Sequence, residues 1–273
     1  MKTTFYLCFF LFSIAWSQNP LERLESSPRH HEWVSVDQES KTQAFLVYPE
    51  VSEKTPVVLL IHENRGLNDW ARSMADQIAE MGYIALAPDF LSGTAPDGGG
   101  TAAFENSDAA RTAIYQLDPT SIRSILENTV NYAKKIPAAN GKVVVIGFCW
   151  GGSQSFQFAT QSTDIETAIV CYGTGPKEAE AYKNIQVPVY GFYGGNDNRV
   201  NATIAMSKTA MEQSKQPFET VIYEGAGHGF FRAGEAEDAS SANKKARAAG
   251  IQRLQEIPTK PQIQNRPPPP THP

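Results

Sequence analysis

The chain has 273 residues, of which 41% are hydrophobic and 19% are charged, and its formal net charge is −5. This composition is typical of a globular protein with a sizeable apolar core, and the length fits one large α/β domain or two small ones. Nucleic-acid binders usually present a clustered basic face, so the acidic balance argues against a nucleic-acid partner.

The first 17 residues have the pattern of an export signal. Lys2 gives a short positive start, residues 5–16 form an apolar run, and Ala-Trp-Ser at 15–17 resembles a small-x-small cleavage site. We therefore expect cleavage before Gln18. The alternative is an uncleaved anchor, but the run is shorter than the roughly 18 apolar residues that span a bilayer. The expected location is periplasmic or secreted, with no stable membrane span after the signal is removed.

Strands and helices alternate along the rest of the chain. A polar leader at 18–30 precedes a domain expected over 31–257, and a proline-rich tail at 258–273 is expected to be disordered. Two β-rich runs predict a hairpin, at 32–36 and 43–48. Further strands are predicted at 57–62, 83–88, 142–148, 167–172, 187–193 and 219–223. Helices are predicted at 69–81, 121–136, 151–160, 202–214 and 242–255. Residues 91–106, rich in Gly, Ala, Thr and Pro, predict a long surface loop.

This alternation predicts an α/β protein whose central sheet is mostly parallel and has helices on both faces. In such sheets, chemistry is expected on the loops that follow the carboxyl ends of the strands. The candidate site residues are therefore sought in those loops.

The strand at 142–148 runs into Gly-Phe-Cys-Trp-Gly-Gly at 147–152, which is the cysteine form of a nucleophile elbow. The elbow needs a sharp, strained turn, and glycines on both sides of Cys149 leave room for the neighbouring backbone. A helix N-terminus beneath the sulfur would favour thiolate, and the N–H of Trp150 could stabilise an oxyanion. The alternative is a glycine-rich turn around a buried cysteine.

Two later loops supply the partners that such a nucleophile needs. Asp197 follows the strand at 187–193, where a carboxylate can hold an imidazole in the right tautomer. His228 lies between glycines after the strand at 219–223. The order of Cys149, Asp197 and His228 along the chain is the order found in α/β-hydrolases. The sequence therefore predicts an α/β-hydrolase fold with a Cys-His-Asp triad.

A fourth loop follows the strand at 57–62 and begins His-Glu-Asn-Arg-Gly. The fold takes its second oxyanion donor from this position. A carboxylate at Glu63 close to Cys149 would oppose thiolate and hold the thiol protonated at rest. Alternatively, Glu63 faces solvent or pairs with Arg65. His62 is expected to be structural.

These motifs resemble the dienelactone hydrolase family of α/β-hydrolases, over about residues 32–254. The similar segments are the elbow at 147–152, His-Glu at 62–63, Pro-Asp at 88–89, the loop of Asp197 and Gly-His-Gly-Phe at 227–230. The resemblance implies a hydrolase of esters or lactones that uses an acyl-enzyme on cysteine. It also implies that Glu63 restrains the resting thiol, and that the Asn64 N–H joins that of Trp150 in the oxyanion hole.

The family's type enzyme grips a substrate carboxylate with two arginines, and the resemblance assigns one of these roles to Arg232. The other arginine is expected shortly after Pro-Asp, but residues 90–93 are Phe-Leu-Ser-Gly. The type enzyme is also cytosolic. The expected substrate is therefore a small-molecule ester or lactone, with a carboxylate allowed but not required.

Two other functions stay open. A non-catalytic ligand-binding protein would keep the same scaffold without turnover. A thiol redox protein would pair Cys149 with Cys171, although the chain has no C-x-x-C and Cys171 lies in an apolar strand. His30, His31 and His62 lack the spacing of metal ligands, so neither a metal nor a cofactor is expected. The protein is expected to be a monomer or a small homo-oligomer.

Overall fold

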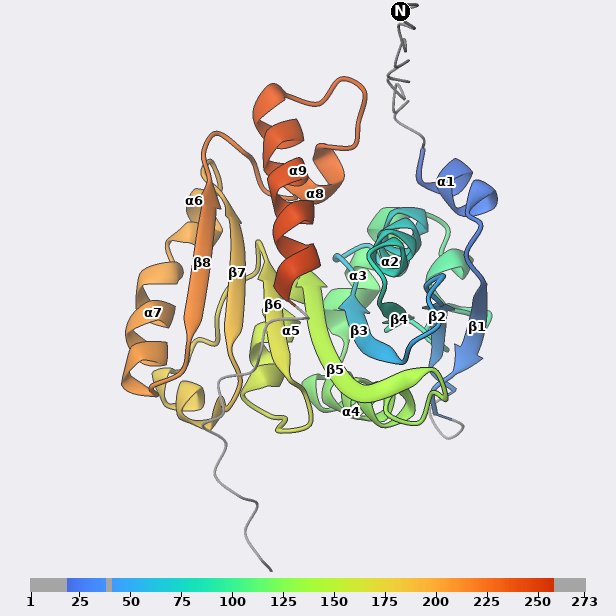
Figure 1. Cartoon of the computed structure of the whole chain (residues 1–273), viewed down its shortest axis with the longest axis horizontal. Coiled ribbons are helices and arrows are strands. Elements are labelled where there is room, and N and C mark those ends of the chain that lie inside the picture. The colour runs from blue at the N-terminus through green and yellow to red at the C-terminus, as the bar shows by residue number, and fades with distance from the viewer. Residues whose placement is uncertain (1–18, 38–40, 258–273) are drawn as a thin grey trace, which may run out of the picture.

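A computed structural model describes residues 19–37 and 41–257, and within them eight strands form one sheet (Figure 1). The strand order is β1-β2-β4-β3-β5-β6-β7-β8. β2 runs antiparallel to β1 and β4, and all other neighbours are parallel. The strands are β1 (His31–Ser35), β2 (Gln43–Val47), β3 (Thr55–Ile61), β4 (Ile84–Pro88), β5 (Ala139–Phe148), β6 (Thr167–Cys171), β7 (Val189–Gly194) and β8 (Phe218–Tyr223). The predicted hairpin and the mostly parallel sheet are confirmed.

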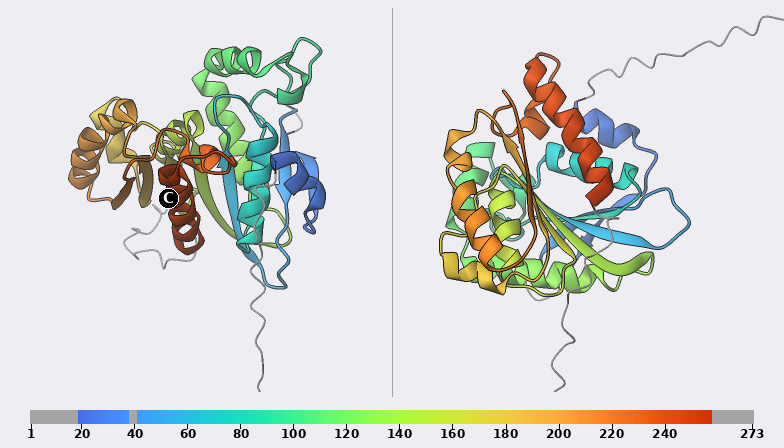
Figure 2. Two further views of the ribbon diagram at one scale, coloured as in Figure 1. Left: turned by 90° about the horizontal axis from the view of Figure 1, so that it is seen from above. Right: turned by 60° about the vertical axis from the view of Figure 1, so that its left-hand side comes forward.

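Helices cover both faces of this sheet (Figure 2). The helices are α1 (Pro20–Ser26), α2 (Asp69–Glu80), α3 (Ser107–Gln116), α4 (Pro119–Ala133), α5 (Trp150–Ala159), α6 (Asn198–Asn201), α7 (Ile204–Gln213), α8 (Phe230–Ala233) and α9 (Ser241–Glu256). Alternate residues of the central strands enter opposite cores, because side chains in a strand point to opposite faces in turn. In β3, Leu59 packs with Leu126 of α4, whereas Leu60 belongs to the core that contains Met74 of α2.

Four helices were not expected from the sequence: the one-turn helices α6 and α8, and the longer α1 and α3. Residues 107–116 had no predicted structure, yet they form α3, which is capped by the Asn106 side chain and buries only Ala110 and Ile114. The apolar side chains of α3 recur with a helical period about as strong as that of α4, so the sequence carried a signal that the prediction missed. Residues 18–30 were expected to be an irregular leader, yet residues 20–26 form α1, whose Leu24 is buried in the α2 core.

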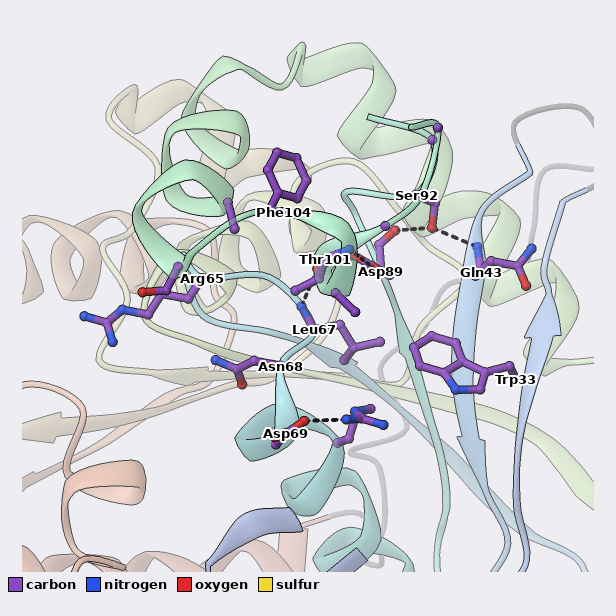
Figure 3. A pocket seen from close by; sticks show the side chains of 18 of the residues that line it. Trp33, Gln43, Arg65, Leu67, Asn68, Asp69, Asp89, Ser92, Thr101 and Phe104 are labelled. Carbon is purple, nitrogen blue, oxygen red and sulfur yellow. Dashed lines mark hydrogen bonds and ion pairs between the residues drawn. The ribbon is translucent and has the colours of Figure 1, made fainter. Parts of the chain in front are cut away.

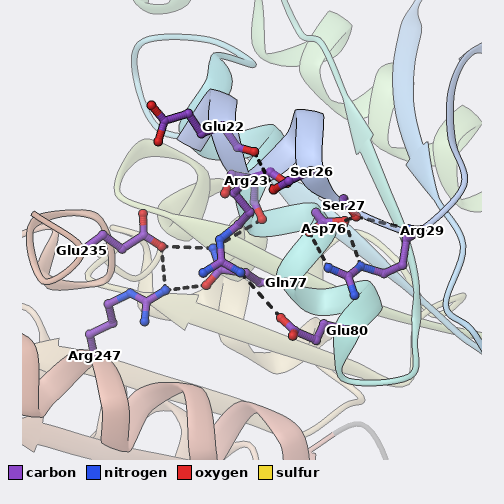
Figure 4. A network of polar contacts seen from close by, with 11 residues as sticks. Glu22, Arg23, Ser26, Ser27, Arg29, Asp76, Gln77, Glu80, Glu235 and Arg247 are labelled. Atoms are coloured by element: carbon purple, nitrogen blue, oxygen red, sulfur yellow. Dashed lines mark hydrogen bonds and ion pairs between the residues drawn. The ribbon is translucent and has the colours of Figure 1, made fainter. Parts of the chain in front are cut away.

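Buried polar contacts fix α2, the helix that follows the first candidate loop (Figure 4). Asp76 is fully buried and accepts hydrogen bonds from Arg29 Nε and Nη2 at 2.9 and 2.7 Å. On the other side, Gln77 donates to Glu235 at 3.0 Å, and Arg247 also donates to Glu235 at 2.6 Å. These contacts tie α2 both to the N-terminal segment and to the region around α8 and α9.

The predicted signal peptide at 1–17 and the predicted tail at 258–273 lie outside the described residues. Among the residues that the structure does describe, no helix combines the length and the apolar character that a membrane crossing requires.

Candidate active site

The elbow has the strained geometry that its sequence predicts. Cys149 adopts φ 57° and ψ −112°, a conformation that is unfavourable for a residue with a Cβ. Its N–H donates to the Cys171 carbonyl at 3.0 Å, and α5 begins at the next residue. A Cβ on Gly151 would collide with the carbonyl oxygens of Ile61 and His62, so the turn requires glycine there. The surrounding backbone therefore holds the sulfur at the end of β5.

Cys149, His228 and Asp197 form a continuous chain of contacts. His228 Nε2 lies 3.1 Å from Cys149 Sγ, and His228 Nδ1 lies 2.6 Å from Asp197 Oδ2. Asp197 also caps α6 by accepting from the Val200 N–H at 3.3 Å. Its side chain is 6% exposed and that of His228 is 34% exposed. The imidazole is thus held between a sulfur and a buried carboxylate, with its outer side open to solvent.

The proton on His228 is stabilised by both neighbours. Burial of the ring opposes protonation, but hydrogen bonds to Cys149 and Asp197, together with their negative charges, raise the pKa of His228 to about 9. At neutral pH these contacts therefore favour the imidazolium form of His228.

Glu63 is buried beside this chain and is bound by two residues. Arg232 Nε donates to Glu63 Oε2 at 2.8 Å, and the Tyr172 hydroxyl donates to Glu63 Oε1 at 3.3 Å. Glu63 is 5% exposed, whereas 43% of the Arg232 side chain is exposed. Both alternatives considered for Glu63 are wrong, because it neither faces solvent nor pairs with Arg65. The two residues singled out as switch and substrate clamp form an ion pair with each other.

Tyr172 is a site residue that the sequence did not indicate. It follows β6 with φ 42°, is fully buried, and its ring packs edge-on against His228 at 5.1 Å between centroids. Burial and the Glu63 charge raise the pKa of Tyr172 well above its usual value, so its hydroxyl stays a donor to Glu63. The only indication in the sequence that Tyr172 belongs to the site was its position at the end of a buried strand. Its positive φ could not be read from the residue type.

The two predicted oxyanion donors come from different loops. Trp150 is the first residue of α5, where a backbone N–H has no partner within the helix. The Asn64 backbone N–H makes no hydrogen bond to any residue in the described part of the chain. The Asn64 side chain donates to the Tyr115 hydroxyl at 3.1 Å, which links this loop to α3.

His62 is a structural residue. It is fully buried, accepts from the Phe90 N–H at 3.4 Å through Nε2, and lies 2.8 Å from the Glu63 carbonyl through Nδ1. Burial lowers the pKa of His62, which keeps the ring neutral, and the ring stacks on Trp150 at 5.7 Å.

Asp89, from the Pro-Asp pair, joins two loops at this edge of the sheet. Its carboxylate accepts from the Thr101 N–H and hydroxyl, both at 2.7 Å, and from the Leu91 N–H at 3.0 Å. Thr101 Oγ1 in turn accepts from the Leu67 N–H at 2.9 Å. The segment after β4 is thereby fastened to the loop that carries Glu63 and Asn64.

Both cysteines in the described residues are free thiols. Cys171 is fully buried, and burial raises its pKa well above the usual value. Its sulfur is therefore a poor nucleophile, in contrast to that of Cys149 beside an imidazole.

Within residues 19–37 and 41–257, no group of three or more His, Cys, Asp or Glu side chains could hold a metal ion.

The strand order, the elbow after β5 and the order of cysteine, aspartate and histidine along the chain define an α/β-hydrolase. Comparison with known proteins narrows this class. The sequence profile of the dienelactone hydrolase family matches residues 42–257, so the chain belongs to that family, whose members are hydrolases of ester or lactone bonds.

Individual relatives agree with this assignment. The chain is 29% identical to carboxymethylenebutenolidase of Pseudomonas putida over 202 residues, which cover 72% of this chain and 84% of that protein. The crystal structure of dienelactone hydrolase from Anabaena variabilis matches with a TM-score of 0.62 at 21% identity, covering 84% of this chain and 96% of the other. A dienelactone hydrolase-like promiscuous phosphotriesterase from metagenomic libraries matches with a TM-score of 0.68 at 23% identity, covering 84% and 98%. At these identities the two structures support the fold alone.

Proposed function

We propose that this protein cleaves an ester or lactone through an acyl-enzyme on Cys149, with His228 and Asp197 completing a catalytic triad. The observation that carries the proposal is the unbroken run of contacts from Cys149 Sγ through the imidazole to the Asp197 carboxylate, at 3.1 and 2.6 Å. These distances lie within hydrogen-bonding reach for a nucleophile, a base and an orienting carboxylate.

In the proposed first half-reaction, the thiolate of Cys149 attacks the substrate carbonyl, and the N–H groups of Asn64 and Trp150 bind the oxyanion. One such donor typically contributes about 10²–10³-fold to the rate. The intermediate collapses by breaking the bond from carbon to the leaving oxygen, which takes the proton from His228. A thioester on Cys149 and an alcohol result; in a lactone the alcohol stays attached to the acyl group.

In the second half-reaction, neutral His228 removes a proton from water as the water attacks the thioester. Collapse of this second intermediate releases the carboxylic acid and returns the thiolate beside imidazolium. Asp197 keeps the Nδ1 proton of His228 in place through both halves and stabilises the charged ring.

Glu63 and Arg232 are proposed to restrain this chemistry until a substrate binds. In the ion pair of 2.8 Å, Arg232 holds the Glu63 carboxylate, with Tyr172 as a second donor. A carboxylate on the substrate would compete with Glu63 for the exposed part of the Arg232 guanidinium. Glu63, once released, could accept the proton of a resting Cys149 thiol.

Trapping the acyl-enzyme tests this function. The purified protein is mixed with an activated acetate ester, quenched in acid and digested, and the peptide that contains Cys149 should carry one acetyl group. The Cys171→Ala variant should be labelled as fast as the parent protein, whereas His228→Ala should be labelled much more slowly. Acetylation that persists on the same peptide in Cys149→Ala, or turnover without any acylated cysteine, would contradict the proposal.

We also propose that the mature protein is exported, on the basis of the sequence pattern at residues 1–17. N-terminal sequencing of the protein recovered from the cell envelope or medium should start at Gln18. A chain that retains Lys2 in that fraction would contradict cleavage.

A further inference from the structure

A cleft of about 1120 Å³ is lined in part by the loop that carries Glu63 and Asn64 of the candidate active site, through Arg65, Leu67 and Asn68 (Figure 3). Its walls come from the loop between β3 and α2, the segment after β4, and the sheet edge at β1 and β2. Cys149, Asp197 and His228 are not among its lining residues. Arg65, two residues after Glu63, lies at one side of the cleft, and Trp33 of β1 lies at the other (Figure 3).

The size of the cleft exceeds what a small lactone needs. Pockets for drug-sized ligands usually measure about 300–1,000 Å³. A compact ester or lactone at Cys149 would leave this neighbouring space empty. The cleft therefore fits a substrate that has an extended part beyond the reacting bond.

Trp33 provides a flat apolar surface in this cleft. It is 49% exposed, although it belongs to a strand, and it packs edge-on against Phe45 at 5.6 Å between centroids. Phe45 is itself covered by the Arg72 guanidinium, which lies 5.8 Å above its ring. An exposed indole face held in this way can pack against the C–H groups on one side of a sugar ring.

Polar groups line the space between these two ends. Four of its lining side chains keep an amide or hydroxyl atom that no residue in the described part of the chain binds: Gln43, Asn68, Asn106 and Ser107. The Ser92 and Thr101 hydroxyls also line the cleft, but both already donate and accept hydrogen bonds within the protein. This density of neutral donors and acceptors suits a ligand that has many hydroxyl groups. An aryl carboxylate could use Trp33 and one cation, but it would leave most of these groups to water.

The charges of the cleft favour an anionic ligand. Three cations, Lys41, Arg65 and Arg72, line it together with two carboxylates, Asp69 and Asp89. Asp69 is paired with Arg72, and the Asp89 carboxylate is occupied by Thr101 and the Leu91 N–H. Arg65 is exposed and forms no ion pair with any residue that the structure describes. Its guanidinium is therefore available for a carboxylate.

We propose that this cleft binds an acidic saccharide, a chain of sugar units bearing uronate carboxylates, whose ester is the bond presented to Cys149. Trp33 packs against a sugar ring, the amide and hydroxyl side chains bind its hydroxyl groups, and Arg65 pairs with a carboxylate. The statement about the ester rests on the function proposed above, but saccharide binding does not require that function.

Binding is measured by calorimetry with trigalacturonate and the inactive Cys149→Ala chain, so that the result is independent of turnover. We expect saturable binding that weakens about tenfold in Arg65→Gln, because one charge-assisted hydrogen bond is lost. Trp33→Ala should weaken it by a similar factor, whereas Trp33→Phe, which keeps an aromatic face, should retain most of the affinity. Lys142→Gln, which removes an exposed cation near the amino end of β5, is the matched control and should bind like the parent.

Three results would overturn the proposal. The first is absence of trigalacturonate binding, or binding that Arg65→Gln and Trp33→Ala leave unchanged. The second is equal affinity for a neutral trisaccharide, which would remove the role of the carboxylate. The third is binding of hydroxybenzoate in place of trigalacturonate, which would assign the cleft to aryl acids. If binding occurs but Cys149 is never acylated, the saccharide site stands and the hydrolase mechanism fails.

Discussion

Two regions of this protein meet at the same edge of the sheet and are built by different means. The proposed triad lies on short loops that follow β5, β7 and β8, where strand pairing and close glycine packing fix the backbone. The segment 89–118 between β4 and α4 is long and is fastened by Asp89, Thr101 and the contact of Tyr115 with Asn64. The first region carries the proposed chemistry, whereas the second lines the cleft proposed to bind the substrate. Changes in the two should therefore affect different properties.

The largest expected effect comes from removing the nucleophile. Cys149→Ala should lower kcat/KM for a small aryl ester by about 10⁶-fold, because nothing else in the site can form the acyl-enzyme. Steady-state assays of the purified variant measure this directly. Cys171→Ala removes the other free thiol and should change the rate by less than about tenfold. A Cys149→Ala variant that keeps a tenth of the parent activity would mean that the elbow does not determine reactivity.

Asp197→Asn should lower kcat by about 10⁴-fold, because the imidazole loses the carboxylate that fixes its tautomer. The pH profile is the sharper measurement. In the parent, activity should fall as the pH rises through about 9, where His228 loses its proton. In Asp197→Asn the fall in activity should occur at lower pH, because one of the contacts that raise the pKa of His228 is lost. A descending limb that stays near pH 9 would separate Asp197 from the titration of His228.

Protonation of His228 also stabilises the folded chain, so stability should depend on pH. The pKa of His228 is raised from 6.5 to about 9 in the folded chain, so the folded state binds the proton more tightly than the unfolded state does. This contribution is complete below pH 6.5 and is lost as the pH rises to about 9. The free energy of unfolding, measured with denaturant at a series of pH values from 6.5 to about 9, should decline as the pH rises. This decline should be smaller in Asp197→Asn.

Sequence patterns predicted the first region better than the second, for physical reasons. The elbow is a local motif whose strain, glycines and flanking strand and helix occupy adjacent residues. Asp197 and His228 could be proposed because each lies on the loop that follows a predicted strand. The ion pair of Glu63 with Arg232 joins residues 169 positions apart, so no local pattern predicts it. Tyr172 adopts a positive φ, which the residue type does not predict.

The helix α3 illustrates the same limit. It buries only Ala110 and Ile114, and its position over the Asn64 loop depends on contacts made by Asp89, Thr101 and Tyr115. Such contacts exist only after the sheet has brought distant loops together, so no local period could reveal them. Residues 92–106 of the predicted surface loop do line the cleft, but its shape depends on the same contacts between distant loops.

Asp89→Asn tests whether the second region depends on its fastening to the first. The amide presents an NH₂ group where the carboxylate accepted hydrogen bonds, so at least one buried donor loses its acceptor. We expect the free energy of unfolding to fall by about 1–3 kcal/mol, measured by urea denaturation. Asp164→Asn is the matched control, because its carboxylate is 65% exposed and its ion pair with Lys134 contributes about 0–1 kcal/mol. Equal losses in both variants would argue against a special role for Asp89.

The smallest expected effect belongs to Tyr115→Phe, which removes only the hydroxyl that accepts from the Asn64 side chain at 3.1 Å. Tyr115 is 60% exposed, so the loss of this hydrogen bond should change stability by no more than about 0.5–1.5 kcal/mol. If α3 steadies the oxyanion loop, kcat should fall by up to about tenfold while KM changes little. Tyr132→Phe on α4, away from the Asn64 loop, should leave both constants as they are. A drop in KM and kcat together, or no change in either, would show that α3 contacts the loop without positioning it.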